Sequence, residues 1–135
     1  MPRIDIAFLL LAAACLIAGT ILGISMGIAH DFQLAPVHAH LNLVGWASLA
    51  LFGVIYRAFP ELAASRLAKI HFWLAAPSAP SFPIGVYLSV IHDMPALAIV
   101  TSLVWLAGVL VFFTAVAQLA FASAPGRIAP AALTR

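Results

Sequence analysis

The chain has 135 residues, of which 65% are hydrophobic and only 7% are charged. Soluble domains carry about 25% charged residues, and a soluble chain this short could not bury so much apolar surface. The six Lys and Arg residues give a net charge of +2, too few to follow a phosphate backbone, so we expect no nucleic-acid partner. The composition predicts a protein whose main solvent is the lipid bilayer.

Long, uniformly apolar runs indicate the fold class. Because backbone groups find no water in lipid, a spanning chain forms helices or a closed barrel, and a barrel needs strands of alternating polarity. Four runs cover about residues 6–28, 36–59, 69–91 and 96–122, each near the roughly 20 residues that cross a bilayer. We therefore expect one all-α domain over residues 1–135, an integral membrane four-helix bundle with short connections.

The first apolar run raises the question of a signal peptide. No Ala-x-Ala site followed by a polar chain comes after it, so we expect a retained span. The basic residues then predict the orientation. None lies in the first or third connection, and all fall on one side of the predicted bundle: Arg3, Arg57, Arg66, Lys69, Arg127 and Arg135. The positive-inside rule makes that side, with both termini, cytoplasmic.

Two spans carry unusual residues. Gly19, Gly23 and Gly27 form one stripe on the first span, where another helix or a flat ligand can approach closely. Three prolines lie inside the third span, at positions 77, 80 and 83. Each proline removes a backbone donor and clashes with the preceding turn, so we expect this helix to be kinked or locally unwound.

Histidines cluster at one predicted membrane depth. Of five, only His71 lies at the inner end of a span, while His30, His38, His40 and His92 lie near outer ends. His38 and His40 follow Pro36, a favoured first residue of a helix. Two helical residues turn by about 200°, so the two imidazoles point to opposite faces and cannot bind one ion together. Either identical protomers pair His38 of one with His40 of the next, or only one histidine binds and the other makes a local bond.

The residues around this pair favour a haem over a bare ion. Neutral imidazole is a good ligand for haem iron, copper or zinc. Gly45 lies two turns below His38, and Ala47 two turns below His40, which leaves room for a flat macrocycle. Asn42 is placed to orient a ligand or a propionate. Apolar walls are expected from Leu41, Val44, Trp46 and Leu51.

Two motifs carry a resemblance to a known family. The segment HAHLNLVGW (38–46), continuing to FGVIYRAFP (52–60), resembles the tenth helix of haem–copper oxidase subunit I. The segment KIHFWL (69–74) resembles the opening of that family's next helix. Small subunit I-like proteins and the haem- and copper-containing membrane proteins of the nitric oxide response are similar as well. The likeness covers about residues 36–74.

The resemblance implies a cofactor and an assembly. It assigns His38 and His40 as axial ligands of haem b iron, leaves His71 outside the iron site, and places the chain in a bacterial inner membrane. Four spans equal one of the three arcs of subunit I, which implies a homotrimer rather than a dimer, with haem between protomers. The HPEVY motif and the His-His pair of the copper site are absent, and Glu61 is the only glutamate. The absence of these motifs argues against standard oxygen or nitric oxide reduction.

Several functions remain open from the sequence. The first is a bis-His haem protein for electron transfer, haem handling or sensing, with an unknown electron-transfer partner. The second is a haem enzyme acting on oxygen, nitric oxide or peroxide through an open iron position. The third is a copper-binding protein using His30, His38 and His92, and the fourth is a structural subunit without a cofactor. Arg57, Lys69 and His71 could line a quinol site, although anchoring the span ends is the simpler role.

Overall fold

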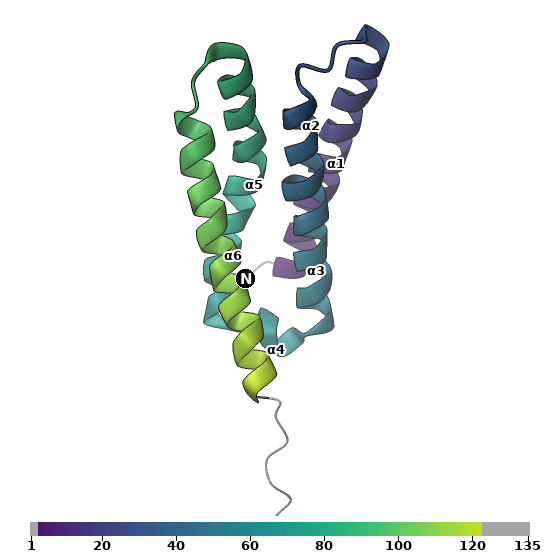
Figure 1. Ribbon diagram of the computed structural model, residues 1–135. Helices are drawn as coiled ribbons and strands as arrows, with labels where there is room; N and C mark the ends of the chain where they lie inside the picture. Colours follow the sequence, from purple (N-terminus) through teal and green to yellow (C-terminus); the bar gives the residue numbers. More distant parts are fainter. Residues whose placement is uncertain (1–2, 123–135) are drawn as a thin grey trace, which may run out of the picture.

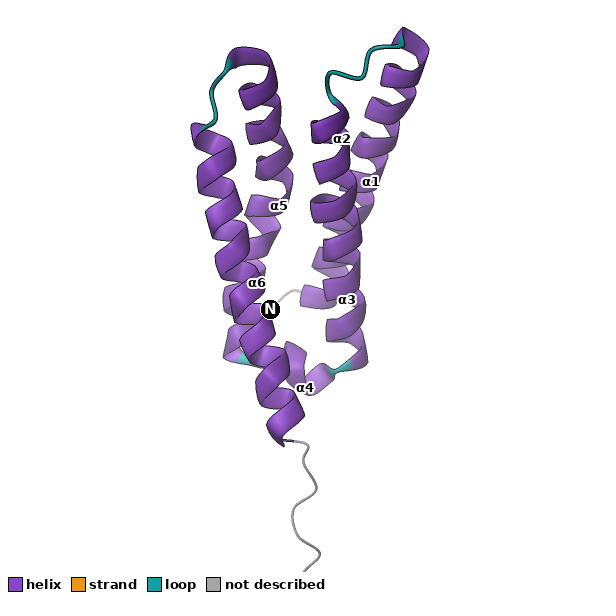
Figure 2. Ribbon diagram, viewed as in Figure 1, coloured by secondary structure: helices purple, strands orange, loops and turns teal. Residues whose placement is uncertain are grey.

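The computed structural model describes residues 3–122, which are helical apart from short connections (Figures 1 and 2). Four helices in this part of the chain are long and apolar enough to cross a membrane. The expectation of an all-α chain with four candidate spans is therefore confirmed. The short helix α4 (Pro60–Ala63) joins the second span to the third.

The first two spans pack side by side. Helix α1 (Ile4–Ala29) is followed by three helical segments that together form the second span: α2 (Ala35–His40), the π-helix η1 (Leu41–Ser48) and α3 (Leu49–Ala58). Small residues let the backbones approach. A Cβ added at Gly53 would lie 2.9 Å from the backbone oxygen of Asp5. Such close approach is the usual basis of helix association in lipid.

The last two spans form a second hairpin, α5 (Arg66–His92) and α6 (Ala96–Ala122). Ser65 caps α5 by accepting a hydrogen bond from the backbone N–H of Ala68 at 3.0 Å. A Cβ on Gly85 would lie 2.5 Å from the backbone nitrogen of Ala98, so the two backbones nearly touch. Asp93 ends α5 in the left-handed conformation, with φ of 55°.

The three prolines do not unwind α5. The helix is continuous from Arg66 to His92 with all three prolines inside it. Of the two outcomes that the sequence predicted, a kink or local unwinding, the unwinding does not occur. The serines of the same segment turn their hydroxyl groups onto the helix. Ser78 donates to the carbonyl of Leu74 at 2.6 Å, and Ser81 donates to that of Pro77 at 2.7 Å. Neighbouring helices and such hydroxyl groups are what make proline tolerable in a membrane helix.

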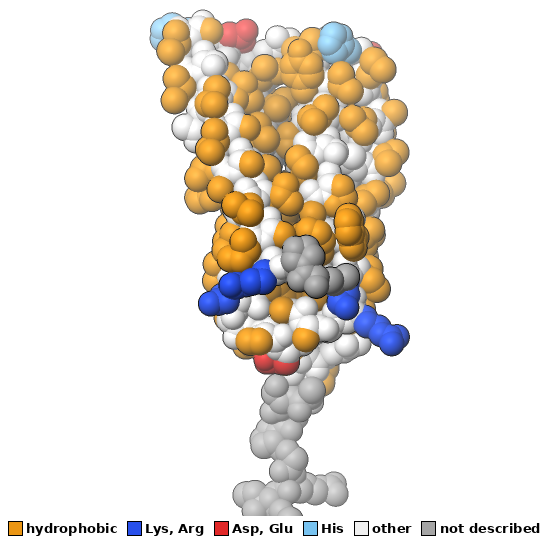
Figure 3. Space-filling model, turned by 180° about the vertical axis from the view of Figure 1, so that it is seen from behind, with side chains coloured by type: hydrophobic (Ala, Val, Ile, Leu, Met, Phe, Trp, Pro, Cys, Tyr) orange, Lys and Arg blue, Asp and Glu red, His pale blue; other side chains and the backbone are white. Residues whose placement is uncertain are grey.

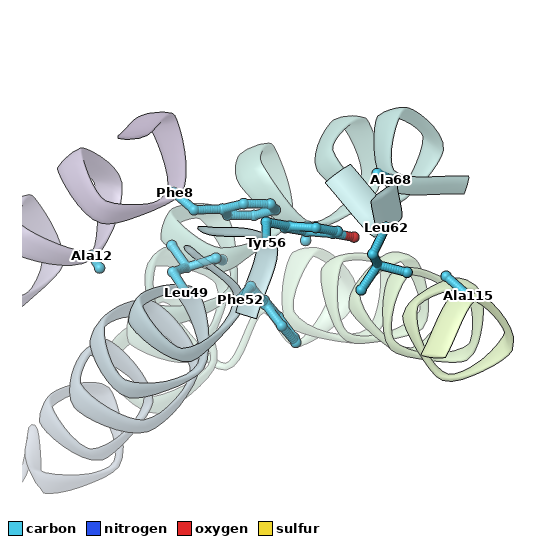
Figure 4. Close-up of a cluster of buried hydrophobic side chains, with 10 residues drawn as sticks. Phe8, Ala12, Leu49, Phe52, Tyr56, Leu62, Ala68 and Ala115 are labelled. Carbon is cyan, nitrogen blue, oxygen red and sulfur yellow. The ribbon is translucent and has the colours of Figure 1, made fainter. Parts of the chain in front are cut away.

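The hydrophobic core lies where the two hairpins meet α4. Phe8 of α1 stacks on Tyr56 of α3 with ring centroids 5.8 Å apart, and Leu49 packs beside them (Figure 4). At the end away from α4, the ribbons of the two hairpins are separated (Figure 1). Many large apolar side chains point outward, Leu10 and Phe113 for example. This outward display matches a surface that contacts lipid.

The bundle has two chemically different ends, visible in Figure 3. We call one the basic end, because it holds the four basic residues of the described part of the chain: Arg3, Arg57, Arg66 and Lys69. We call the other the histidine end, because the loops there follow His30 and His92. Arg127 and Arg135 lie outside the described residues.

Candidate functional site

His38 projects from the second span onto α1. Its Nδ1 lies 2.9 Å from the backbone oxygen of Gly19. A Cβ added at Gly23 would come within 2.8 Å of Cε1 of the imidazole, so the ring occupies the space that a side chain at this position would fill. Two members of the glycine stripe therefore accommodate the polar residues His38 and Asn42, since Gly19 faces the Asn42 amide in the same way. At Gly27 no atom lies within 4 Å of the added Cβ.

The hydrogen bond to Gly19 fixes the form of the neutral His38 imidazole. A backbone carbonyl only accepts, so Nδ1 must carry the proton and Nε2 keeps its lone pair. The amide nitrogen of Asn42 lies 3.4 Å from both ring nitrogens. The short bond of this amide, 2.8 Å, goes to the carbonyl of His38, and its second N–H makes the longer contact with the ring, where Nε2 can accept it. A ligand at Nε2 would replace this long contact with Asn42.

His40 lies on the other side of the same helix. Its Nδ1 is 2.7 Å from the carbonyl oxygen of Pro36, one turn earlier, which again leaves the lone pair on Nε2. Its ring meets the Phe82 ring of α5 edge-on, with centroids 4.7 Å apart. His38 therefore faces α1 and His40 faces α5, in agreement with the 200° between them.

A π-helix follows directly after His40, where the sequence had predicted regular helix. The side chains of the widened segment η1 donate to backbone carbonyls. Asn42 bonds the carbonyl of His38, and the hydroxyl of Ser48 donates to Leu43 at 2.8 Å. Short π-helical insertions inside α-helices are frequent at functional sites.

Other predicted site residues have different surroundings from those expected. Gly45 is buried, and an added Cβ would lie 2.8 Å from both Cβ and Sγ of Cys15. The room expected there for a macrocycle is filled by Cys15 because α1 packs close to η1. Trp46 is 41% exposed and makes no ring contact with either histidine within residues 3–122. Asn42 does lie beside His38, as described above.

An apolar pocket of about 520 Å³ lies between α1, the second span and α5. Neither histidine lines it. Two lining residues are next in sequence to the pair of rings in contact: Leu41 follows His40, and Pro83 follows Phe82. The pocket is walled by Leu11, Ala14, Cys15, Ala18, Leu22, Leu34, Val37, Leu41, Pro80, Pro83, Ile84 and Tyr87.

The donor set fits a haem iron as one axial ligand on each side of the second span. Each imidazole offers one Nε2, and the two point to opposite sides, so one chain cannot supply both ligands of one iron. A metal ion without a haem would need several ligands close together. Residues 3–122 contain no group of three His, Cys, Asp or Glu placed to hold a metal, so His30, His38 and His92 are not gathered within one chain.

A buried polar pair at the basic end was missed by sequence reasoning. His71 of α5 is 0% exposed, and its Nδ1 lies 2.9 Å from the hydroxyl group of Tyr56 on α3. Both residues lie at the basic ends of spans that follow one another in the chain, so their shared depth was a signal available from the sequence. The resemblance leaves His71 outside the iron site and implies no partner for it.

Fold and site define the class of this protein. Four apolar helices make it a multi-pass helical membrane protein, with histidines presented on two flanks of the second span. Comparison of the chain with models of protein families, with curated proteins and with solved structures gave no match.

Proposed function

We propose that this protein binds b-type haem in the membrane, with His38 and His40 as axial ligands, for electron transfer, haem handling or redox sensing. The observation that carries the proposal is the bonding of the two imidazoles. In each, a backbone carbonyl bonds Nδ1, which orients the ring and keeps the lone pair on Nε2; at His38 a ligand would replace the 3.4 Å contact from Asn42. A bond of this kind on the second nitrogen is typical of metal-ligating histidines and raises ligand basicity.

The opposite orientation of the two rings implies an assembly. A bis-His iron needs two imidazoles on one axis, which two copies of the chain supply when the His38 flank of one meets the His40 flank of the next. Such a head-to-tail contact forms a ring when the rotation between successive copies closes on itself. The resemblance to one four-helix arc of oxidase subunit I favours three copies. The outward apolar side chains leave ample surface for this contact and for lipid.

The chain's own residues define what the site can do. Haem iron, when bound, supplies one-electron redox chemistry. With His38 and His40 both bound to it, the iron would have no open position, which suits electron transfer or sensing rather than substrate binding. Asn42 limits the movement of the His38 ring, and Phe82 limits that of His40. We further propose that the basic end faces the cytoplasm of a bacterial inner membrane.

A visible spectrum tests this function directly. Protein expressed with ample haem and purified in detergent should give a strong Soret band, and a sharp α-band after dithionite reduction. Reduced protein should bind carbon monoxide poorly, because a bis-His iron has no open position. Ready carbon monoxide binding would instead favour an enzyme with one protein ligand.

Three alanine variants assign the ligands. His38→Ala and His40→Ala should each lose or shift the low-spin spectrum. His92→Ala is the matched control, because His92 is exposed at the histidine end and should leave the spectrum unchanged. A wild-type protein that remains colourless and folded would overturn the proposal. An unchanged spectrum in His40→Ala would remove that residue from the iron site.

A further inference from the structure

A second pocket lies at the basic end, well away from the histidine flanks. It has a volume of about 420 Å³ and opens between the start of α1, the end of α3, α4 and the start of α5. Three basic residues and one acid border it, together with small and apolar walls. The lining residues are Arg3, Ile4, Asp5, Tyr56, Arg57, Pro60, Ala63, Ala64 and Lys69.

The charges around this pocket do not cancel. Asp5 accepts from Arg3 at 2.9 Å, and its carboxylate lies 3.6 Å from Arg57. This bond, and then the charge of Asp5, raise the pKa of Arg3. Lys69 makes no ion pair within the described part of the chain. Three cations against one carboxylate leave two positive charges facing one cavity.

The first turn of α1 adds to this positive field. Arg3 is the N-cap residue and its side chain makes no capping hydrogen bond, and in the first turn the Asp5 carboxylate accepts from the backbone N–H of Ile6. A 26-residue helix also places the positive end of its dipole here. The basic side chains of Arg3, Arg57 and Lys69 and the N-terminal end of α1 border one cavity, and this combination is typical of phosphate sites.

We propose that this pocket binds the phosphate group of an anionic phospholipid. The basic end coincides with the ends of the four spans, where lipid headgroups lie, and the apolar walls at Ile4 and Pro60 suit the glycerol and upper acyl region. Basic pockets between helix ends bind anionic headgroups in this way. A soluble phosphate ester has the same recognised group, so the two sources are separated by experiment.

General attraction of basic residues to a charged membrane would not need a pocket. Arg66 provides the comparison, because it is exposed at the same end and carries the same charge but does not line the cavity. A specific site therefore predicts that replacing Arg57 or Lys69 weakens the affinity for the phospholipid and that replacing Arg66 does not. General attraction predicts equal effects from all three.

The test measures thermal unfolding of the purified full chain in neutral detergent. The additives are short-chain phosphatidylglycerol, short-chain phosphatidylcholine and inorganic phosphate, each titrated separately. Phosphatidylglycerol should raise the melting temperature and phosphatidylcholine should not. Lys69→Gln should weaken the apparent affinity about fivefold, and Arg57→Gln/Lys69→Gln further, since each surface cation contributes about that factor. Arg66→Gln should behave as wild type.

Each outcome decides the question. Lys69 makes no ion pair in the described residues, so Lys69→Gln remains informative even if the double variant does not fold. A pocket-dependent shift with inorganic phosphate alone upholds phosphate binding and assigns a soluble source. The proposal is overturned if neither phosphatidylglycerol nor inorganic phosphate shifts the melting temperature, or if Arg66→Gln and Lys69→Gln lose affinity equally. None of these readings depends on haem.

Discussion

The hydroxyl group of Tyr56 and Nδ1 of His71 lie 2.9 Å apart and join the second span to α5 inside an aromatic cluster. Phe52 meets the His71 ring edge-on at 4.5 Å, and Phe8 and Phe112 lie within 5.3 Å of it. Nε2 of His71 is buried and has no hydrogen-bond partner in residues 3–122. Within residues 3–122, the bond to Tyr56 is thus the hydrogen bond that satisfies this imidazole.

Removal of the Tyr56 hydroxyl group should destabilise the fold. In Tyr56→Phe both nitrogens of His71 would be buried without a partner, and an unsatisfied buried polar group costs about 1–3 kcal/mol. Thermal or denaturant unfolding in detergent should show a lower free energy of unfolding by that amount.

The double variant provides the control for this pair. In Tyr56→Phe/His71→Phe both polar partners are replaced by rings of similar shape, a change that can be nearly neutral. Its loss of stability should therefore be smaller than that of Tyr56→Phe, and the cycle gives the coupling between the residues. Equal stability of Tyr56→Phe and wild type would contradict this account.

Gly23→Ala should displace the His38 imidazole. The new methyl group would lie 2.8 Å from Cε1 of the ring, so the ring must move. If His38 ligates haem, the α-band should broaden or disappear while the protein stays folded. Gly27→Ala is the matched control on the same stripe, where no atom lies within 4 Å. An identical spectrum for Gly23→Ala would argue against an iron ligand at His38.

Gly85→Ala should separate α5 from α6. The added Cβ would lie 2.5 Å from the nitrogen and 2.7 Å from Cα of Ala98, and backbone atoms cannot rotate away as a side chain can. Overpacking of this kind costs about 1–3 kcal/mol. At Gly108 the nearest atom, Cβ of Leu74, is 3.4 Å away, so Gly108→Ala should cost little. Comparable melting temperatures for the two variants would rule out the close crossing.

Orientation can be read by cysteine labelling in a Cys15→Ala background. Met94 lies in the loop after α5 at the histidine end, and Ala64 lies beside the basic end; both are exposed. A maleimide that cannot cross membranes should label Met94→Cys in intact spheroplasts. It should label Ala64→Cys only after lysis. The reverse pattern would invert the proposed topology.

Part of this architecture follows from local sequence properties. The number of candidate spans depends on how long each run stays apolar, which is a property of the chain alone. The opposite orientation of His38 and His40 depends only on helical rotation, and the structure has one ring toward α1 and the other toward α5. The gathering of Arg3, Arg57 and Lys69 at one end follows from the alternation of spans. The haem, the trimer and the topology stay predictions.

Contacts between spans were decided only in three dimensions. Nothing local shows that Cys15 fills the space beside Gly45, that Tyr56 bonds His71, or that Arg57 and Lys69 share a cavity. The reason is physical. Lipid is as apolar as a leucine side chain, so burial does not select one helix face, and close packing of small and polar residues sets the register instead. The sequence by itself determined which segments cross the membrane, and tertiary packing determined which residues meet.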